Sequence, residues 1–89
     1  MDQQAFETEL SRAGYTAIET KTIEPKPVNS AHTHDDIVRG LVLDGIFIVT
    51  KGNKPTAYRA GDIFQVAAGE PHTEAFGPQG ARVMVGRKY

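Results

Sequence analysis

The sequence predicts an all-β domain, a small antiparallel sandwich or barrel preceded by one short N-terminal helix. Turn-forming residues recur about every 6–12 positions through most of the chain, and the segments between them are short. These segments are rich in β-branched and aromatic residues, which favour strands. The chain has 89 residues, so we expect a single domain over 1–89, with the helix within 1–14 and the barrel over 15–89.

The helix is predicted over residues 2–13. Asp2 can cap its N-terminus by accepting hydrogen bonds from backbone N–H groups. Phe6, Leu10 and Ala13 recur at helical spacing and give one apolar stripe. Gly14 then suits the left-handed position that ends a helix. A helix of about three turns is marginal in isolation, so we expect this one to pack on the rest of the domain.

The strands follow from Tyr15 onward, with Pro25 and Pro27 interrupting regular pairing. Asp44-Gly45 lies between two apolar runs and predicts a two-residue type I′ hairpin, because both turn positions need positive φ. Residues 52–53, 60–62, 67–71 and 77–80 predict further turns. We therefore expect strands over 15–23, 31–34, 37–43, 46–50, 56–59, 63–66, 72–76 and 81–86.

Composition excludes several classes of function. The chain has no cysteine, so neither a disulfide nor a thiolate metal cage can stabilise it. The formal net charge is −1 and no basic cluster occurs, so we expect no nucleic-acid partner. No apolar run reaches the ~20 residues of a membrane span, so we expect no membrane association. The polar, acidic start of the sequence does not resemble a secretory signal, so we expect a cytoplasmic protein.

All three histidines of the chain can contribute to one metal site. His32 and His34 are one residue apart, so in a strand both side chains point to the same face. His72 follows a turn-like segment and can meet them from a later strand. Three neutral imidazoles suit a divalent transition metal such as Fe, Zn, Ni or Mn, and the order of affinities does not choose among these metals. Three protein ligands also leave open coordination positions, as catalytic sites require.

The two histidine segments together resemble the cupin superfamily. The first cupin motif has a His-x-His pair, a glutamate and a glycine, and here it would run from His32 through His34 to Gly45. The second motif would run from Gly61 through Gly69 to His72. The resemblance covers about residues 28–86. It implies a small antiparallel jelly-roll barrel with His32, His34 and His72 as metal ligands inside its mouth.

The chain departs from the cupin pattern at three positions. Val38 stands where the first motif has its glutamate ligand, Ala67 replaces the proline of the second motif, and Phe76 falls on its terminal asparagine. The resemblance therefore carries over three ligands and not the fourth. A fourth ligand can be water, Glu74, which shares the face of His72, or Asp36, in that order of preference.

We expect a metal-dependent enzyme that acts on a small organic molecule. The resemblance to cupins implies an oxygenase, isomerase or lyase, and a site of three histidines without a carboxylate is similar to that of thiol and diketone dioxygenases in that superfamily. Glu74 and Tyr58 are the candidates for the catalytic acid or base. The alternative is a non-catalytic barrel that binds or senses a sugar or metabolite. We also expect a homodimer, because exposed sheet edges in a short barrel otherwise favour aggregation.

Overall fold

The computed structural model describes residues 2–23, 33 and 35–89. Helix α1 spans Gln3–Arg12. Asp2 caps it as predicted, since its Oδ1 accepts a hydrogen bond from the Ala5 N–H at 2.8 Å. Phe6 and Leu10 are fully buried, which confirms these two residues of the predicted apolar stripe, whereas Ala13 is the exposed C-cap of the helix.

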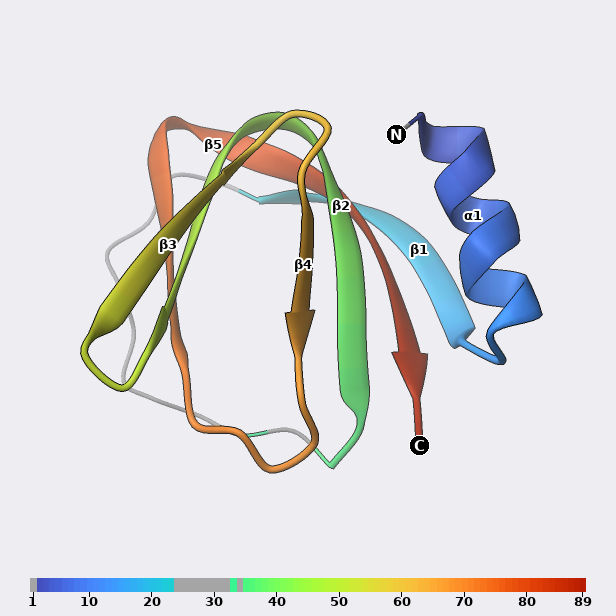
Figure 1. The fold of residues 1–89 in the computed structure, drawn as a ribbon. Coiled ribbons are helices and arrows are strands. Elements are labelled where there is room, and N and C mark those ends of the chain that lie inside the picture. The colour runs from blue at the N-terminus through green and yellow to red at the C-terminus, as the bar shows by residue number, and fades with distance from the viewer. Residues whose placement is uncertain (1, 24–32, 34) are drawn as a thin grey trace.

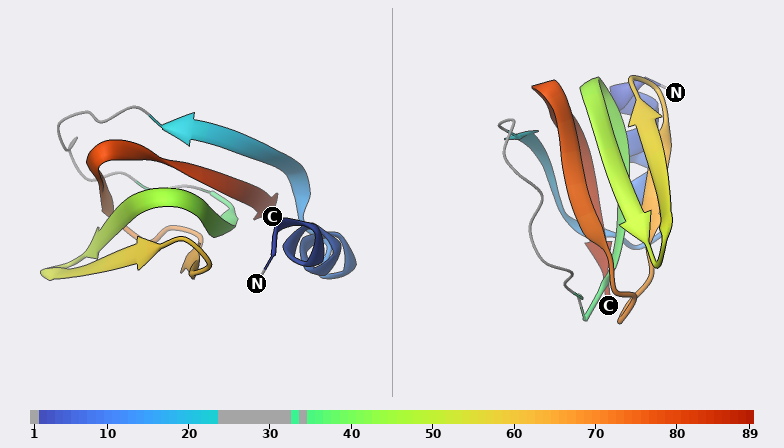
Figure 2. Two further views of the ribbon diagram at one scale, coloured as in Figure 1. Left: turned by 90° about the horizontal axis from the view of Figure 1, so that it is seen from above. Right: turned by 90° about the vertical axis from the view of Figure 1, so that its left-hand side faces the viewer.

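In the part of the chain that the structure describes, five strands follow the helix, all in one antiparallel sheet with the order β1-β5-β2-β3 and with β4 paired to β2. The view from above in Figure 2 shows this order, with α1 at the end of the sheet where β1 begins. The predicted all-β barrel with one N-terminal helix is confirmed (Figure 1). The strands are β1 (Thr16–Ile23), β2 (Ile37–Lys51), β3 (Lys54–Arg59), β4 (Ile63–Val66) and β5 (Thr73–Lys88).

Two predicted turns are wrong. The chain makes no hairpin at Asp44-Gly45, and residues 77–80 form no turn between two strands, because β2 and β5 run through these positions without a break. The β2–β5 pairing instead shifts its register on either side of Gly45, which bends the sheet. A Cβ atom on Gly45 would lie 2.3 Å from the Gly80 carbonyl oxygen. The two glycine-containing segments therefore pack against each other at a bend that both long strands share.

This bend folds each long strand back over the domain and creates two layers. The first part of β2 pairs with β4 and with the end of β5, whereas the second part of β2 pairs with β3 and with the start of β5. The inner faces enclose a core made of Val42, Phe47, Val49, Phe64, Val66, Ala81, Val83 and Val85. The domain thus has one apolar interior between the layers.

A second, smaller core lies on the outer face, between α1 and the sheet. Phe6 and Leu10 of the helix meet Leu41 of β2 and Met84 of β5. Because strand side chains alternate, Leu41 faces the helix while its neighbour Val42 faces the interior. These apolar contacts with the sheet stabilise a helix that would be too short to be stable alone.

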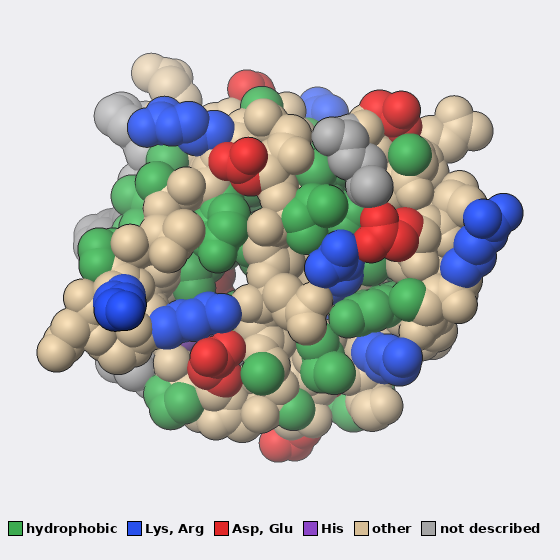
Figure 3. Space-filling view, in the orientation of Figure 1, with side chains coloured by type: hydrophobic (Ala, Val, Ile, Leu, Met, Phe, Trp, Pro, Cys, Tyr) green, Lys and Arg blue, Asp and Glu red, His purple; other side chains and the backbone are tan. Residues whose placement is uncertain are grey.

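Charged side chains of both signs are interspersed over the face of the molecule seen in Figure 3. Within the described residues, no helix is both long and apolar enough to cross a membrane. The strand predicted over residues 31–34 falls outside the described residues except for Thr33, which is not in a strand.

Candidate functional site

A cavity of about 180 Å³ lies between the two layers of the barrel. Most of its wall is apolar, and four of its lining side chains can carry charge. These residues come from β1, β2, β4, β5 and the segment just before β5. The lining residues are Lys21, Ile23, Val38, Phe47, Val49, Phe64, Val66, His72, Glu74, Val85 and Arg87.

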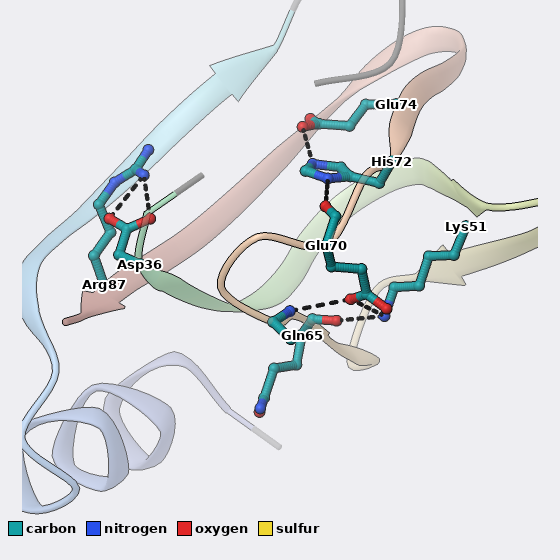
Figure 4. Close-up of polar contacts among 8 residues, drawn as sticks. Asp36, Lys51, Gln65, Glu70, His72, Glu74 and Arg87 are labelled. Atoms are coloured by element: carbon teal, nitrogen blue, oxygen red, sulfur yellow. Dashed lines mark hydrogen bonds and ion pairs between the residues drawn. The ribbon is translucent and has the colours of Figure 1, made fainter. Parts of the chain in front are cut away.

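His72 is almost completely buried, with 2% of its surface exposed. Its Nδ1 lies 3.1 Å from the backbone carbonyl oxygen of Glu70. A carbonyl oxygen can only accept, so Nδ1 carries a proton and donates it to this hydrogen bond. In the neutral imidazole, Nε2 then presents its lone pair. Nε2 lies in turn 3.2 Å from Oε1 of Glu74 (Figure 4).

The segment before His72 is fixed by the side chain of Glu70. Its Oε1 accepts a hydrogen bond from the Ala67 N–H at 3.1 Å and lies 3.3 Å from Nζ of Lys51. The Lys51 ammonium also donates to the Gln65 carbonyl at 2.8 Å. The hydrogen bond from Ala67, and after it the interaction with Lys51, lower the pKa of the Glu70 carboxyl below its ordinary value. The charged form of Glu70 therefore holds the turn whose carbonyl orients His72.

Glu74 occupies the position that the sequence predicts, on the same side of the chain as His72. Its side chain is 29% exposed, whereas that of His72 is 1% exposed. The carboxylate therefore lies at the rim of the cavity and the imidazole deeper inside. Two acceptors, a carboxylate oxygen and an imidazole lone pair, repel each other at 3.2 Å unless a cation or a proton lies between them.

Asp36 is engaged elsewhere. It is 3% exposed, and its two oxygens accept hydrogen bonds from Nη1 of Arg87 at 3.4 and 3.2 Å (Figure 4). Arg87, near the end of β5, lines the cavity beside Val85. Arg87 is not among the site residues predicted from the sequence. The alternation Val83, Val85, Arg87 was the signal that could have placed Arg87 on the inner face.

The other predicted site residues are distributed as follows. His32 and His34 lie outside the described residues, and within residues 2–23, 33 and 35–89 no three His, Asp or Glu side chains gather closely enough to hold a metal ion. Val38 lines the cavity. Tyr58 of β3 packs against Phe64, with ring centroids 5.8 Å apart, and is not among the residues that line the cavity.

Comparison with known proteins identifies the family. The family model described as "Cupin domain" matches residues 20–84, which is most of the chain, and the chain therefore belongs to the cupin family. This confirms the resemblance that the histidine segments indicated. The matched region includes the second half of β1, all of β2 to β4, most of β5 and the whole segment between β1 and β2.

Solved structures with the same fold are distant in sequence. A protein of unknown function from Rhizobium leguminosarum is 20% identical with a TM-score of 0.74, over 84% of this chain and 70% of the other. Two proteins from Shewanella frigidimarina are also similar. A cupin-2 domain containing protein is 14% identical, with a TM-score of 0.66 over 90% of this chain and 88% of the other. An RmlC-like cupin is 19% identical, with a TM-score of 0.64 over 81% and 65%.

These structural similarities establish the fold alone, because all the identities are low. For several of the similar structures, the chain spans only 50–65% of their length. No curated protein matches the sequence. The activity must therefore be argued from the residues of the cavity.

Proposed function

We propose that this chain is a metal-dependent cupin enzyme that acts on a small organic molecule in the cavity between its two layers. His32, His34 and His72 would hold one divalent transition metal. The observation that carries the proposal is the orientation of His72. Its Nδ1 donates a hydrogen bond to the backbone carbonyl of Glu70, and its Nε2 faces the carboxylate of Glu74 at the wall of an apolar cavity.

The donor atoms of this pair fit a metal ligand set. A metal-bound histidine characteristically donates its other ring N–H to a carbonyl or carboxylate, as His72 does to Glu70. Two ligand atoms on one metal, each about 2.1 Å from it, are separated by about 3.0–3.4 Å in octahedral or tetrahedral geometry. The 3.2 Å between Nε2 of His72 and Oε1 of Glu74 falls in this range. A cation between the two acceptors would also relieve their repulsion.

The metal and the residues that line the cavity would have different roles in the reaction. A bound metal would supply Lewis-acid polarisation of a substrate oxygen or a binding position for dioxygen. The apolar wall formed by Phe47, Val49 and Phe64 keeps bulk water from the reacting atoms. Glu74 lies at the rim and can exchange a proton with substrate at Oε1, which makes it the first candidate for the acid or base. Tyr58 is the second and weaker candidate, because it packs against Phe64 and does not line the cavity.

The decisive experiment is metal analysis of the purified, tag-free protein beside a His72→Ala variant and a matched Glu74→Gln variant. We expect near one equivalent of a transition metal in the parent protein. His72→Ala should remove most of this metal. Glu74→Gln should retain it if water completes the ligand set, and should weaken binding if the carboxylate is a fourth ligand. Equal metal content in the parent and His72→Ala would refute the site.

A second candidate function is non-catalytic binding of a small molecule. The observation that favours it is the cavity itself, which is lined by apolar side chains from both layers and so can hold a ligand without a metal. Turnover separates the two functions. An enzyme converts its ligand only when metal is bound, whereas a sensor releases the same ligand unchanged from the metal-free and the metal-loaded protein.

Two further expectations complete the proposal. We propose that the protein is a homodimer that pairs along β1, because β1 ends the strand order and, among the described residues, no strand pairs with its outer edge. Light scattering at micromolar concentration tests this, and a monomer would contradict it. We also propose a cytoplasmic location, which imaging of a tagged copy in its host would test.

A further inference from the structure

The cavity separates apolar from charged side chains. The apolar residues that line it belong to the buried core or pack against it. Its charged residues lie toward solvent, since the side chains of Arg87 and Lys21 are 28% and 43% exposed. Besides Glu74, the lining therefore carries two cations at the rim above an apolar interior.

Arg87 stands on the opposite layer from Glu74. It pairs with Val38 in the first part of β2, whereas Glu74 pairs with Val49 in the second part, beyond the bend. Among the described residues, the hydrogen bonds of the Arg87 guanidinium come from Nη1 alone, and both go to Asp36. A guanidinium has five N–H donors in a planar fork. The buried Asp36 thus fixes the side chain, and no other acceptor within residues 2–23, 33 and 35–89 takes its remaining N–H donors.

We infer that the ligand of this cavity is a small organic acid, bound with its carboxylate on Arg87 and its apolar body against the interior wall. The inference rests on the proposed function, because both use this cavity as the ligand site. Arginine and carboxylate form one of the strongest classes of side-chain hydrogen bond. Lys21 is the second cation of the lining, and the exposed Glu19 pairs with it at 3.2 Å, so Arg87 is the main anchor for the carboxylate.

The size of the cavity limits the apolar body of this acid. A cavity of about 150 Å³ accommodates a benzene molecule in an engineered protein. The present cavity, of about 180 Å³, therefore takes a body of about six to eight non-hydrogen atoms, with the carboxylate at the rim. A long-chain fatty acid or a sugar chain would not fit inside it.

Two probes of nearly equal shape test this inference, the benzoate anion and neutral benzamide. Binding is followed by ligand-observed NMR on the 89-residue chain after chelator treatment, so that a metal cannot bind the carboxylate itself. We expect benzoate to bind at least about tenfold more tightly than benzamide, as one charge-assisted pair provides. Arg87→Gln should abolish this preference. Arg82→Gln, an exposed arginine on the same strand that does not line the cavity, is the matched control and should keep it.

A substitution of Asp36 distinguishes two roles of Arg87, binding of the ligand and mere neutralisation of the Asp36 charge. If Arg87 only neutralises Asp36, then Asp36→Asn leaves benzoate affinity unchanged. If Arg87 binds the ligand, Asp36→Asn removes a competing carboxylate and raises benzoate affinity severalfold. Should Arg87→Gln fold poorly with Asp36 left unpaired, the Asp36→Asn/Arg87→Gln double variant removes both charges and should still lack the preference.

Equal binding of the two probes, no binding of either, or a benzoate preference that survives Arg87→Gln would overturn the inference. Metal content measured on the same preparations before chelation distinguishes this failure from failure of the proposed function. A metal-loaded protein without the benzoate preference refutes only the organic-acid ligand. A benzoate preference in a protein that takes up no metal supports the inference and refutes the metal-dependent enzyme.

Discussion

Replacement of Gly45 by alanine should destabilise the domain far more than replacement of a glycine in an ordinary turn. Gly45 has a φ of +79°, and its Cβ would lie 2.3 Å from the Gly80 carbonyl oxygen and 3.0 Å from the Cα of Ala81. The left-handed backbone costs an alanine about 1–2 kcal/mol. The clash is with backbone, which cannot rotate away, and forcing extra atoms into packed structure adds about 1–3 kcal/mol. We therefore expect a loss of about 2–5 kcal/mol.

Gly52→Ala is the matched control for this experiment. Gly52 lies in the β2–β3 turn with a φ of +60°, and no atom of the described residues lies within 4 Å of the Cβ it would gain. Only the cost of the left-handed backbone conformation applies here, so the expected loss of stability is about 1–2 kcal/mol. Urea unfolding followed by far-UV circular dichroism measures both losses, provided that the unfolding free energy depends equally steeply on urea concentration in the parent and the variants. Losses equal within about 0.5 kcal/mol would refute the packed bend and favour a simple hairpin at residues 44–45.

Three further predictions concern the supports of the site and the site itself. Glu70→Gln should lower stability at neutral pH. Because folding lowers the pKa of Glu70, its charge stabilises the fold above the unfolded-state pKa, and this contribution is lost as the pH falls through the folded-state pKa. The difference between parent and variant in urea unfolding should therefore be larger at neutral pH than in acid, and a constant difference would contradict this. Leu10→Ala should cost about 2–5 kcal/mol in the same assay, since Leu10 is fully buried between helix and sheet; a loss below about 1 kcal/mol would mean that α1 is not docked. Metal-loaded protein should release its metal below about pH 6, because imidazoles bind metals only when neutral. A colorimetric chelator follows this release, and retention in stronger acid would argue against histidine ligands.

The helix and the class of fold could be predicted because their signals are local. Asp2, Phe6 and Leu10 act within three turns of one helix, and the structure places all three as predicted. Most strand residues likewise follow from β-branched residues between turn signals, although β2 and β5 each join two segments that the turn signals predicted as separate strands. Here the residues themselves carry the information, without any knowledge of what packs against them.

The bend at Gly45 and the role of Arg87 could not be predicted, because both depend on contacts with distant parts of the chain. Glycine at positive φ serves a tight turn and a β-bulge equally well, so Asp44-Gly45 predicts a hairpin when only its neighbours are considered. Only the pairing of β2 with β5, and the approach of Gly80, decide between the two. The position of Arg87 likewise depends on a distant residue, the buried Asp36, which binds its guanidinium.

The candidate site was predictable in part. The resemblance of the histidine segments to cupins led to the family, and the face shared by His72 and Glu74 follows from strand alternation. The hydrogen bond from His72 to the Glu70 carbonyl has no signal in the sequence, because any residue at position 70 supplies a carbonyl. The position of Tyr58 against Phe64 depends on the pairing of β2 with β3, which brings Tyr58 opposite Phe47.

The location of a bound metal tests the central claim most directly. Crystals of the protein reconstituted with Zn²⁺ or Fe²⁺, measured on both sides of the metal absorption edge, give an anomalous signal that marks the ion alone. We predict one peak in the cavity, about 2.0–2.2 Å from Nε2 of His72, with Nδ1 still bonded to the Glu70 carbonyl. A peak remote from His72, or no peak with Nε2 of His72 still beside Glu74, would contradict the account.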